Sequence, residues 1–327
     1  MAYRTGERNG DERDARQARP QAPERFAALD RPMDAAAYNY EHFRATHVGG
    51  EVRRTVRRAG VAPGEPAPDF ELPRVGGGTW RLAHAVNPPV LLRFGSYSCP
   101  ITVGSVEPLK RLMAHFGERV QMVDVLVRQG HPGPRVPAYD DEARKLADAQ
   151  RYKEDDDIPW TVLVDDLQGT VHQAYGALAD PTYLIDVDGR VAFYGMWAHV
   201  PTLFEAVEAL LAQGGRGVVR GGVDRRAHLA AAVSNGWPAL RRGLPQSAVD
   251  LETSVPLSAA AAWLGYQLRP LLAPLTQRER PLPPAAKAAL GAAAAVGALL
   301  VARRALRPPA ARVREREPGA AGAATVR

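Results

Sequence analysis

Residues 89–101, PVLLRFGSYSCPI, constrain the fold of this chain more than any other stretch. The run at 90–94 is apolar but for one arginine and is bounded by proline and glycine, which is typical of a buried strand in a parallel sheet. Gly95 ends the run, and Pro100 suits the first position of a helix, where a missing N–H costs nothing. The stretch predicts a strand that turns into a helix, at the edge where open α/β sheets place their chemistry.

Cys99 is the only cysteine of the chain, and it lies at this predicted junction. A sulfur at the start of a helix faces unpaired N–H groups and the positive end of the helix dipole, and both favour thiolate over thiol. The position therefore predicts a depressed pKa and a reactive nucleophile. A buried and inert thiol, the ordinary role of a lone cysteine, is the alternative.

Apolar periodicity along residues 63–212 predicts alternating strands and helices. We expect strands at 70–72, 79–82, 90–94, 120–127, 161–164, 181–185 and 191–194, and helices at 100–116, 140–153, 168–175 and 200–212. Asp188 and Gly189 predict a hairpin between the last two strands, and Pro108 is expected to kink the first helix. The order indicates an α/β fold with a mixed central sheet flanked by helices.

The net charge of +6 comes from arginine-rich ends, whereas the middle of the chain carries acidic runs at 140–142 and 154–157. The sequence has no basic stretch with interleaved aromatic residues, so we expect no nucleic-acid partner. One cysteine excludes an intramolecular disulfide, and the first residues lack the apolar core of a secretory signal. We therefore expect a cytoplasmic protein.

An alanine-rich segment at 284–305 is the one candidate for membrane contact. Its uncharged run at 288–302 is shorter than the roughly 20 residues that a spanning helix needs. Arg303, Arg304 and Arg307 follow directly, as a positive cytoplasmic flank would. The sequence leaves three alternatives open, which are a spanning helix, a surface-bound helix and a soluble helix.

Four stretches, read in order, resemble the thioredoxin-like redoxin superfamily, and within it the iodothyronine-deiodinase-like and peroxiredoxin-like branch. They are PGEPAPDFELP at 63–73, FGSYSCP at 94–100, RQGHPG at 128–133 and LVDDLQGTVHQAYGAL at 163–178. The resemblance implies a thioredoxin-like fold over under half of the chain.

The domain organisation follows from this resemblance together with composition. Residues 60–213 are expected to form the redoxin domain, after a disordered or short helical extension at 1–59. Residues 214–223 are predicted as a Gly/Arg linker. Residues 224–327 are predicted as a helical, low-complexity extension that ends disordered.

The resemblance also implies roles for particular residues. It places Cys99 at the family's nucleophile and His131 at its active-site histidine, although a solvated loop histidine is the alternative for His131. Pro181 matches the position of a cis-proline, with an ordinary trans proline at a strand start as the alternative.

Four more residues near Cys99 are candidates for supporting roles. Ser96 stands three residues before Cys99, where related peroxiredoxins carry threonine, and Ser98 precedes the cysteine directly. Tyr97 occupies a position where some relatives have a second thiol. Thr102 replaces the second cysteine of a thioredoxin, and its hydroxyl either donates to the thiolate or bonds its own helix carbonyl.

The sulfur count limits the chemistry. Without a resolving thiol, Cys99 must react with an external thiol or cycle through a sulfenic acid. We therefore expect a thiol-dependent oxidoreductase acting on a small-molecule substrate or a disulfide, with deiodinase-like reductive dehalogenation as one alternative. A non-catalytic redoxin that serves as a binding or membrane-tethered module is another. No cofactor motif or metal-ligand spacing is present, so we expect neither.

Overall fold

The computed structural model describes residues 33–286, 288–289, 292 and 296, to which the structural statements below refer. Met1–Pro281 and Leu282–Arg327 form two separate compact units. The first unit contains every strand and numbered helix named here, and the described residues of the second are partly helical.

A six-stranded mixed sheet forms the centre of the first unit, in the order β5-β4-β3-β6-β7-β8. Its strands are β3 (Val90–Gly95), β4 (Gln121–Leu126), β5 (Thr161–Val164), β6 (Thr182–Ile185), β7 (Val191–Gly195) and β8 (Val223–Asp224). β3, β4 and β5 run parallel, and β6 pairs antiparallel with both β3 and β7. A separate hairpin joins β1 (Glu71–Pro73) to β2 (Thr79–Arg81). The predicted α/β class, with a mixed central sheet flanked by helices, is confirmed.

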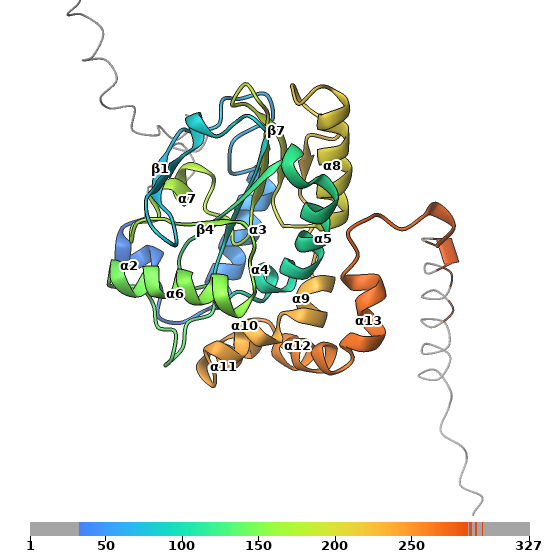
Figure 1. The fold of residues 1–327 in the computed structure, drawn as a ribbon. Coiled ribbons are helices and arrows are strands. Elements are labelled where there is room, and N and C mark those ends of the chain that lie inside the picture. The colour runs from blue at the N-terminus through green and yellow to red at the C-terminus, as the bar shows by residue number, and fades with distance from the viewer. Residues whose placement is uncertain (1–32, 287, 290–291, 293–295, 297–327) are drawn as a thin grey trace, which may run out of the picture. The chain divides into compact units, whose positions relative to one another are not determined.

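Helices cover this sheet and extend beyond its end, as Figure 1 shows. They are α2 (Ala35–Tyr38), α3 (Ala45–Arg57), α4 (Pro100–Gly104), α5 (Val106–Phe116), α6 (Glu142–Asp155), α7 (Thr170–Ala174) and α8 (Val200–Ala212). The C-terminal part adds α9 (Ala230–Asn235), α10 (Trp237–Arg242), α11 (Gln246–Ser254), α12 (Ser258–Gln267) and α13 (Arg269–Thr276). Short 3-10 turns lie at Leu82–His84 and Gly117–Arg119.

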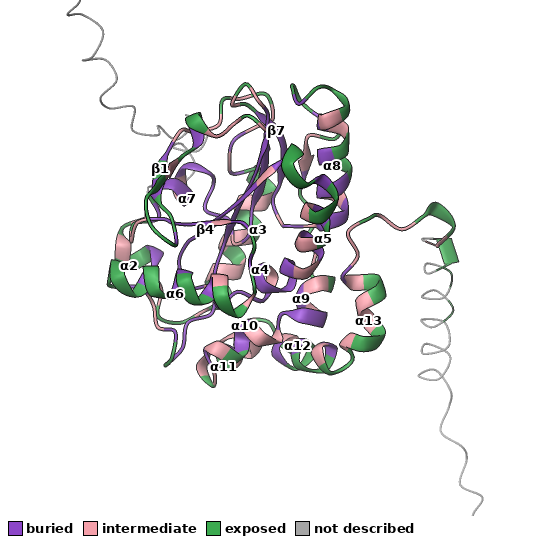
Figure 2. Cartoon of the chain, in the orientation of Figure 1, coloured by how far each residue is buried: buried purple, intermediate pink, exposed green. Residues whose placement is uncertain are grey.

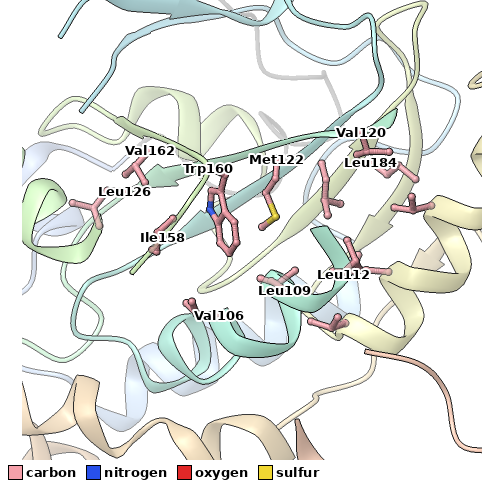
Figure 3. Close-up of a cluster of buried hydrophobic side chains, with 14 of the residues drawn as sticks. Val106, Leu109, Leu112, Val120, Met122, Leu126, Ile158, Trp160, Val162 and Leu184 are labelled. Atoms are coloured by element: carbon pink, nitrogen blue, oxygen red, sulfur yellow. The ribbon is translucent and has the colours of Figure 1, made fainter. Parts of the chain in front are cut away.

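Both faces of the sheet are buried, which explains why its central strand reads as a continuous apolar run. Successive residues of a strand point to opposite faces, so Leu91 belongs to one core cluster and Leu92 to the other. Leu109 of α5 and Leu203 of α8 cover the first face, part of which Figure 3 shows. Tyr38 of α2 lies on the second face. Figure 2 shows the strands at the centre of the sheet buried and the outer helix surfaces exposed.

One buried ion pair interrupts this apolar interior. Arg93 of β3 donates to both carboxylate oxygens of Asp124 on β4, and its guanidinium also donates to the hydroxyl of Tyr152 at 2.6 Å. A further bond of 3.0 Å runs from Arg93 to the carbonyl of Thr102 in α4. The sheet therefore holds the short helix α4 through a charged group at its centre.

The predicted helix at 100–116 is divided in two, because the chain breaks at Ser105 between α4 and α5. Pro108 was expected to kink this helix, and the interruption at Ser105 lies where a proline at 108 has its effect. Pro108 has no N–H to donate to the carbonyl of Gly104 four residues earlier, so the helix that starts at Pro100 does not continue regularly through it.

The segment 214–223 makes defined contacts with the β6–β7 hairpin. The N–H of Val187 donates to the carbonyl of Gly215 at 3.1 Å, and the N–H of Val219 donates to Ala192 at 3.1 Å. β8 then extends the sheet, and α9 packs on α4, α12 and α13. Figure 1 shows α9 to α13 grouped beyond α4, at one end of the sheet.

No helix within the described residues is both long and apolar enough to cross a membrane. The candidate segment 284–305 lies largely outside those residues.

Candidate functional site

Cys99 stands where the sequence predicted it, between the end of β3 and the start of a helix. Its N–H donates to the carbonyl of Ser96 at 3.2 Å, which closes the turn after β3. Its own carbonyl accepts from Val103 at 3.1 Å, and Pro100 takes the first helical position of α4. The proline therefore starts the helix with Cys99 as the capping residue.

The expected depressed pKa of Cys99 is wrong. Burial raises the pKa of its thiol to about 11, and the negative charge of Asp180 raises it further. Bonds from Thr102 and from the N–H of Ile101 lower it, as the helix-start argument predicted, but burial outweighs them. The thiol is 4% exposed and is therefore neutral at pH 7.

Cys99 nevertheless borders a cavity of about 420 Å³, whose walls also include Ser96, Gly130 and His131. Gly130 comes so close that a Cβ built on it would lie 3.0 Å from the Cβ of Cys99. A side chain at position 130 would crowd Cys99, so glycine lets this loop lie against the cysteine.

His131 lies in the same cavity wall as Cys99, as the resemblance implied, and is buried instead of solvated. Its backbone N–H donates to the Ser98 hydroxyl at 3.1 Å, and the centre of its ring lies 4.4 Å from that of Phe43. Burial lowers the pKa of His131 to about 4, so the imidazole is neutral at pH 7. Its Nδ1 has no hydrogen-bond partner among the described residues.

Ser96 and Ser98 connect the cysteine turn to the histidine loop. The Ser96 hydroxyl accepts from the N–H of Gly130 at 2.7 Å. The Ser98 hydroxyl donates to the side-chain carbonyl of Gln129 at 2.7 Å. These bonds hold the turn that carries Cys99 against the loop that carries His131.

Thr102 lies one helical turn beyond Cys99 and is fully buried. Its hydroxyl donates to Asp180 at 3.0 Å and accepts from the N–H of Ser96 at 3.1 Å. Burial raises the pKa of Asp180 to about 7, and the second oxygen of this carboxyl has no partner among the described residues. The sequence analysis missed Asp180, for which adjacency to Pro181 was the one available signal.

Tyr97 points away from the cavity. Its hydroxyl donates to Asp155, and the guanidinium of Arg242 lies 4.0 Å from its ring centre. Arg242 also donates to the Tyr97 carbonyl at 2.6 Å and to Asp156 at 2.8 Å. Tyr97 therefore links the turn before Cys99 to the C-terminal helix α10.

The expected cis bond at Pro181 is wrong, because the cis X–Pro bonds of the described chain are Asn87–Pro88 and Leu244–Pro245. Pro181 precedes β6, and its carbonyl accepts from the N–H of Phe94 on β3 at 3.0 Å. A trans bond lets the residue enter the antiparallel β3–β6 pair as an ordinary strand start.

One group with ligand-type side chains, His199, Asp224 and His228, was not expected from the sequence. The two imidazole rings stack in parallel planes, with centroids 3.7 Å apart and an angle of 6°. The in-plane lone pairs of parallel rings do not converge on one metal ion. Although burial opposes its ionisation, hydrogen bonds from His228 and Arg226 hold the pKa of Asp224 well below its usual range. The arrangement is a buried carboxylate, Asp224, bonded to the exposed guanidinium of Arg226 and to the ring of His228.

Residues 63–194 match the model of the AhpC/TSA family. The matched segment includes Cys99, His131 and Pro181, and runs from before β1 to within β7. This segment is similar to redoxins of that family, and the match does not reach the deiodinase-like branch. No curated protein matches the chain.

Solved structures similar to this chain align with part of it. A candidate thiol:disulfide interchange protein DsbE from Chlorobium tepidum is 23% identical and covers 48% of this chain and 99% of its own, with a TM-score of 0.38. Peroxidoxin BcpB from Mycobacterium tuberculosis is 23% identical and covers 46% and 98%, with a TM-score of 0.36. A secreted M. tuberculosis disulfide oxidoreductase homologous to E. coli DsbE is 17% identical and covers 43% and 96%, with a TM-score of 0.35.

Proposed function

We propose that the protein is a thiol oxidoreductase in which Cys99 is the nucleophile and an external thiol is the reductant. The observation that carries the proposal is the position of Cys99 at the junction of sheet and helix, on the wall of a cavity sized for a small molecule. The match of residues 63–194 to the AhpC/TSA family supports the reaction class. The chain has one cysteine, so the reductant must come from outside.

With a disulfide substrate, the Cys99 thiolate attacks one sulfur, the S–S bond breaks, and a thiolate leaves with the bonding electron pair. The product is a mixed disulfide on Cys99. An external thiolate then attacks the substrate-derived sulfur, which restores the Cys99 thiolate and gives a new disulfide. The net reaction is an exchange, in which one external thiol enters the new disulfide and one thiol of the substrate is released.

With a hydroperoxide substrate, the Cys99 thiolate attacks the terminal oxygen and the O–O bond breaks. The alkoxide takes a proton and leaves as an alcohol, and Cys99 becomes a sulfenic acid. One external thiol then condenses with this acid and releases water. A second external thiol attacks the resulting mixed disulfide and frees Cys99.

The first step requires loss of the thiol proton. With a pKa of about 11, Cys99 is ionised in roughly one molecule in ten thousand at pH 7. The neutral imidazole of His131 borders the same cavity and can accept or donate a hydrogen bond through Nδ1. We assign His131 the transfer of the proton to the leaving group.

A mass-spectrometric test addresses the thiol cycle. Intact protein is exposed briefly to hydrogen peroxide or to bis(2-hydroxyethyl) disulfide, and its mass is read before and after addition of dithiothreitol. We expect one oxygen or one thiol half to be added and then removed, and Cys99→Ser to acquire neither. Unmodified wild-type protein, under conditions that modify free cysteine, would contradict the proposal.

A second candidate is a binding module that holds a small apolar ligand without turning it over. The raised pKa of the buried thiol favours this candidate, since a neutral thiol is a weak nucleophile. Ligand binding that is equal in wild type and Cys99→Ser, together with an unreactive thiol, would identify it. We do not assign reductive dehalogenation, because the family match does not extend to that branch.

A further inference from the structure

The cavity at Cys99 is built largely by parts of the chain outside the matched family segment. Its volume of about 420 Å³ lies in the range of roughly 300–1,000 Å³ that is usual for small-molecule sites. The matched segment provides Cys99, Gly130 and His131, while residues before 63 and after 194 provide much of the remaining wall.

The N-terminal wall is aromatic. The ring of Tyr40 stacks on that of His47 at 4.0 Å, and Phe43 lies 4.4 Å from the ring of His131. The Tyr40 hydroxyl donates to the carbonyl of Gly130 at 2.9 Å, so this wall is tied to the loop beside Cys99. Burial lowers the pKa of His47, which favours its neutral form.

The C-terminal wall is aliphatic and is seated closely on the active-site helix. Its lining residues include Ala232 and Val233 of α9, Leu251 of α11 and Ala262 of α12. A Cβ on Gly104 of α4 would lie 2.8 Å from the carbonyl oxygen of Ala231, and one on Gly236 would lie 2.6 Å from the Cβ of Pro100. Glycine at both positions lets the two helical segments meet.

The carboxylate and guanidinium groups that line the cavity already pair with one another. Glu51 lies 3.7 Å from Arg54 and 3.8 Å from Arg128, and it accepts from the N–H of Ala179 at 3.0 Å. The guanidinium of Arg128 also lies over the ring of Tyr40 at 5.4 Å. A charged ligand would lose its hydration here and disturb this arrangement, whereas an apolar one would lose little.

We propose that this cavity selects uncharged small molecules with an apolar body, and that Ala262 and its neighbours on α9 and α11 make the selection. The inference rests on the proposed function for the role of the thiol, while the binding of the apolar body stands without it. A molecule of this class places its reactive bond against Cys99 and its body against the aliphatic wall.

Two disulfide reagents of opposite character test the selection. The neutral aromatic 4,4′-dithiodipyridine and the dianionic 5,5′-dithiobis(2-nitrobenzoate) are both attacked by the Cys99 thiolate, which cleaves their S–S bond. The first reagent releases 4-thiopyridone, after protonation on nitrogen, and the second releases a nitrothiobenzoate, and each product is followed by its absorbance. Because both react with the same thiolate, the pKa of Cys99 cancels in the ratio of the two rates. We expect this ratio in the folded protein to exceed that in urea-unfolded protein by roughly tenfold or more, in favour of the neutral reagent.

Matched variants locate the selection. Ala262 is buried in the cavity wall, whereas Ala260 of the same helix is exposed. Ala262→Phe should fill the cavity and bring the ratio of the two rates close to that of the unfolded protein, while Ala260→Phe should keep the ratio of the folded wild type. An unchanged ratio in Ala262→Phe, or equal ratios in folded and unfolded wild type, would overturn the inference.

A binding measurement separates this inference from the proposed function. The neutral probe N-phenyl-1-naphthylamine is titrated into Cys99→Ser and followed by fluorescence. We expect saturable, blue-shifted emission that Ala262→Phe removes and Ala260→Phe retains. If the thiol of wild type reacts with neither reagent but the probe still binds in this pattern, the oxidoreductase fails and the apolar site stands. Absence of saturable binding overturns the apolar site, whatever the reactivity of the thiol.

Discussion

The hydroxyl of Thr102 donates a hydrogen bond of 3.0 Å to the carboxyl group of Asp180, and both residues are buried next to Cys99. Asp180 is the acidic group whose charge raises the pKa of the Cys99 thiol after burial itself. An acid between this hydroxyl and the strand start at Pro181 therefore controls how easily the thiol ionises.

Replacing Asp180 with asparagine should lower the pKa of Cys99, because the buried negative charge that opposes ionisation is removed. Each unit by which the pKa falls gives about a tenfold higher rate of iodoacetamide labelling at pH 8. The control is Asp186→Asn, since Asp186 is equally buried but lies at the other end of β6. A rate equal to that of wild type would show that Asp180 does not act on the thiol.

Asp180 should also make stability depend on pH. Its pKa is raised from 3.8 to about 7, mainly by burial, so the folded state holds a proton that the unfolded state releases between these values. The stability that this raised pKa contributes is fully present below pH 3.8 and is lost as the pH rises to about 7. Between pH 5 and pH 8, the free energy of unfolding of Asp180→Asn, measured by urea denaturation, should rise by about 3 kcal/mol relative to that of wild type. If the free energies of unfolding of the two proteins differ by the same amount at every pH, the raised pKa of Asp180 is contradicted.

His131 should stay neutral over the working range of the thiol. Because burial lowers the pKa of His131 to about 4, the labelling rate of Cys99 between pH 5.5 and 8 should show no step that depends on His131. His131→Gln should keep the shape of this profile, as should His84→Gln at an exposed position. A step between about pH 6 and 7 that only His131→Gln removes would show an imidazolium beside the sulfur.

Arg93 should be essential for stability. Arg93→Met leaves the Asp124 carboxylate buried without its cation, which costs about 3–5 kcal/mol. Adding Asp124→Leu should recover part of this loss. Arg144→Ala breaks the exposed pair with Asp140 and should cost less than about 1 kcal/mol. Equal losses for Arg93→Met and Arg144→Ala in urea denaturation would be inconsistent with a buried pair.

Gly104 should be intolerant of a side chain. A Cβ there meets the Ala231 carbonyl at 2.8 Å, so Gly104→Ala must displace α9 from α4. We expect a loss of about 1–3 kcal/mol and faster iodoacetamide labelling of Cys99. At Gly49 of α3, a Cβ has no neighbour within 4 Å among the described residues, and alanine should stabilise by about 0.5–1 kcal/mol. Wild-type stability and labelling in Gly104→Ala would refute the close fit.

Local patterns were sufficient to predict five of the six strands of the central sheet, all but β8, and the position of Cys99 after β3. The strand at 161–164 and the helix at 200–212 have the predicted bounds, because period and flanking residues define them. Pro100 starts α4 for the local reason given. Pro108 is the local signal for the interruption at Ser105, because it has no N–H for the carbonyl of Gly104, although the sequence did not show that the segment divides into two helices.

The surroundings of Cys99 could not be predicted, because they come from distant parts of the chain. Helix-start N–H groups lower its pKa as expected, yet the outcome depends on how deeply the residue is buried. The cavity beside Cys99 is also lined by Phe43, before the matched segment 63–194, and by Ala262, after it, and their positions follow from tertiary contacts. Asp180 likewise becomes relevant only when β6 pairs with β3.

The bond from Arg242 to the carbonyl of Tyr97 joins a helix beyond the family match to the turn that precedes Cys99. A fragment limited to residues 63–194 would lack the aliphatic wall of the cavity, and its thiol would face bulk water. Reactivity measured on such a fragment would describe a different chemical environment, so biochemical work should start from the uncut chain.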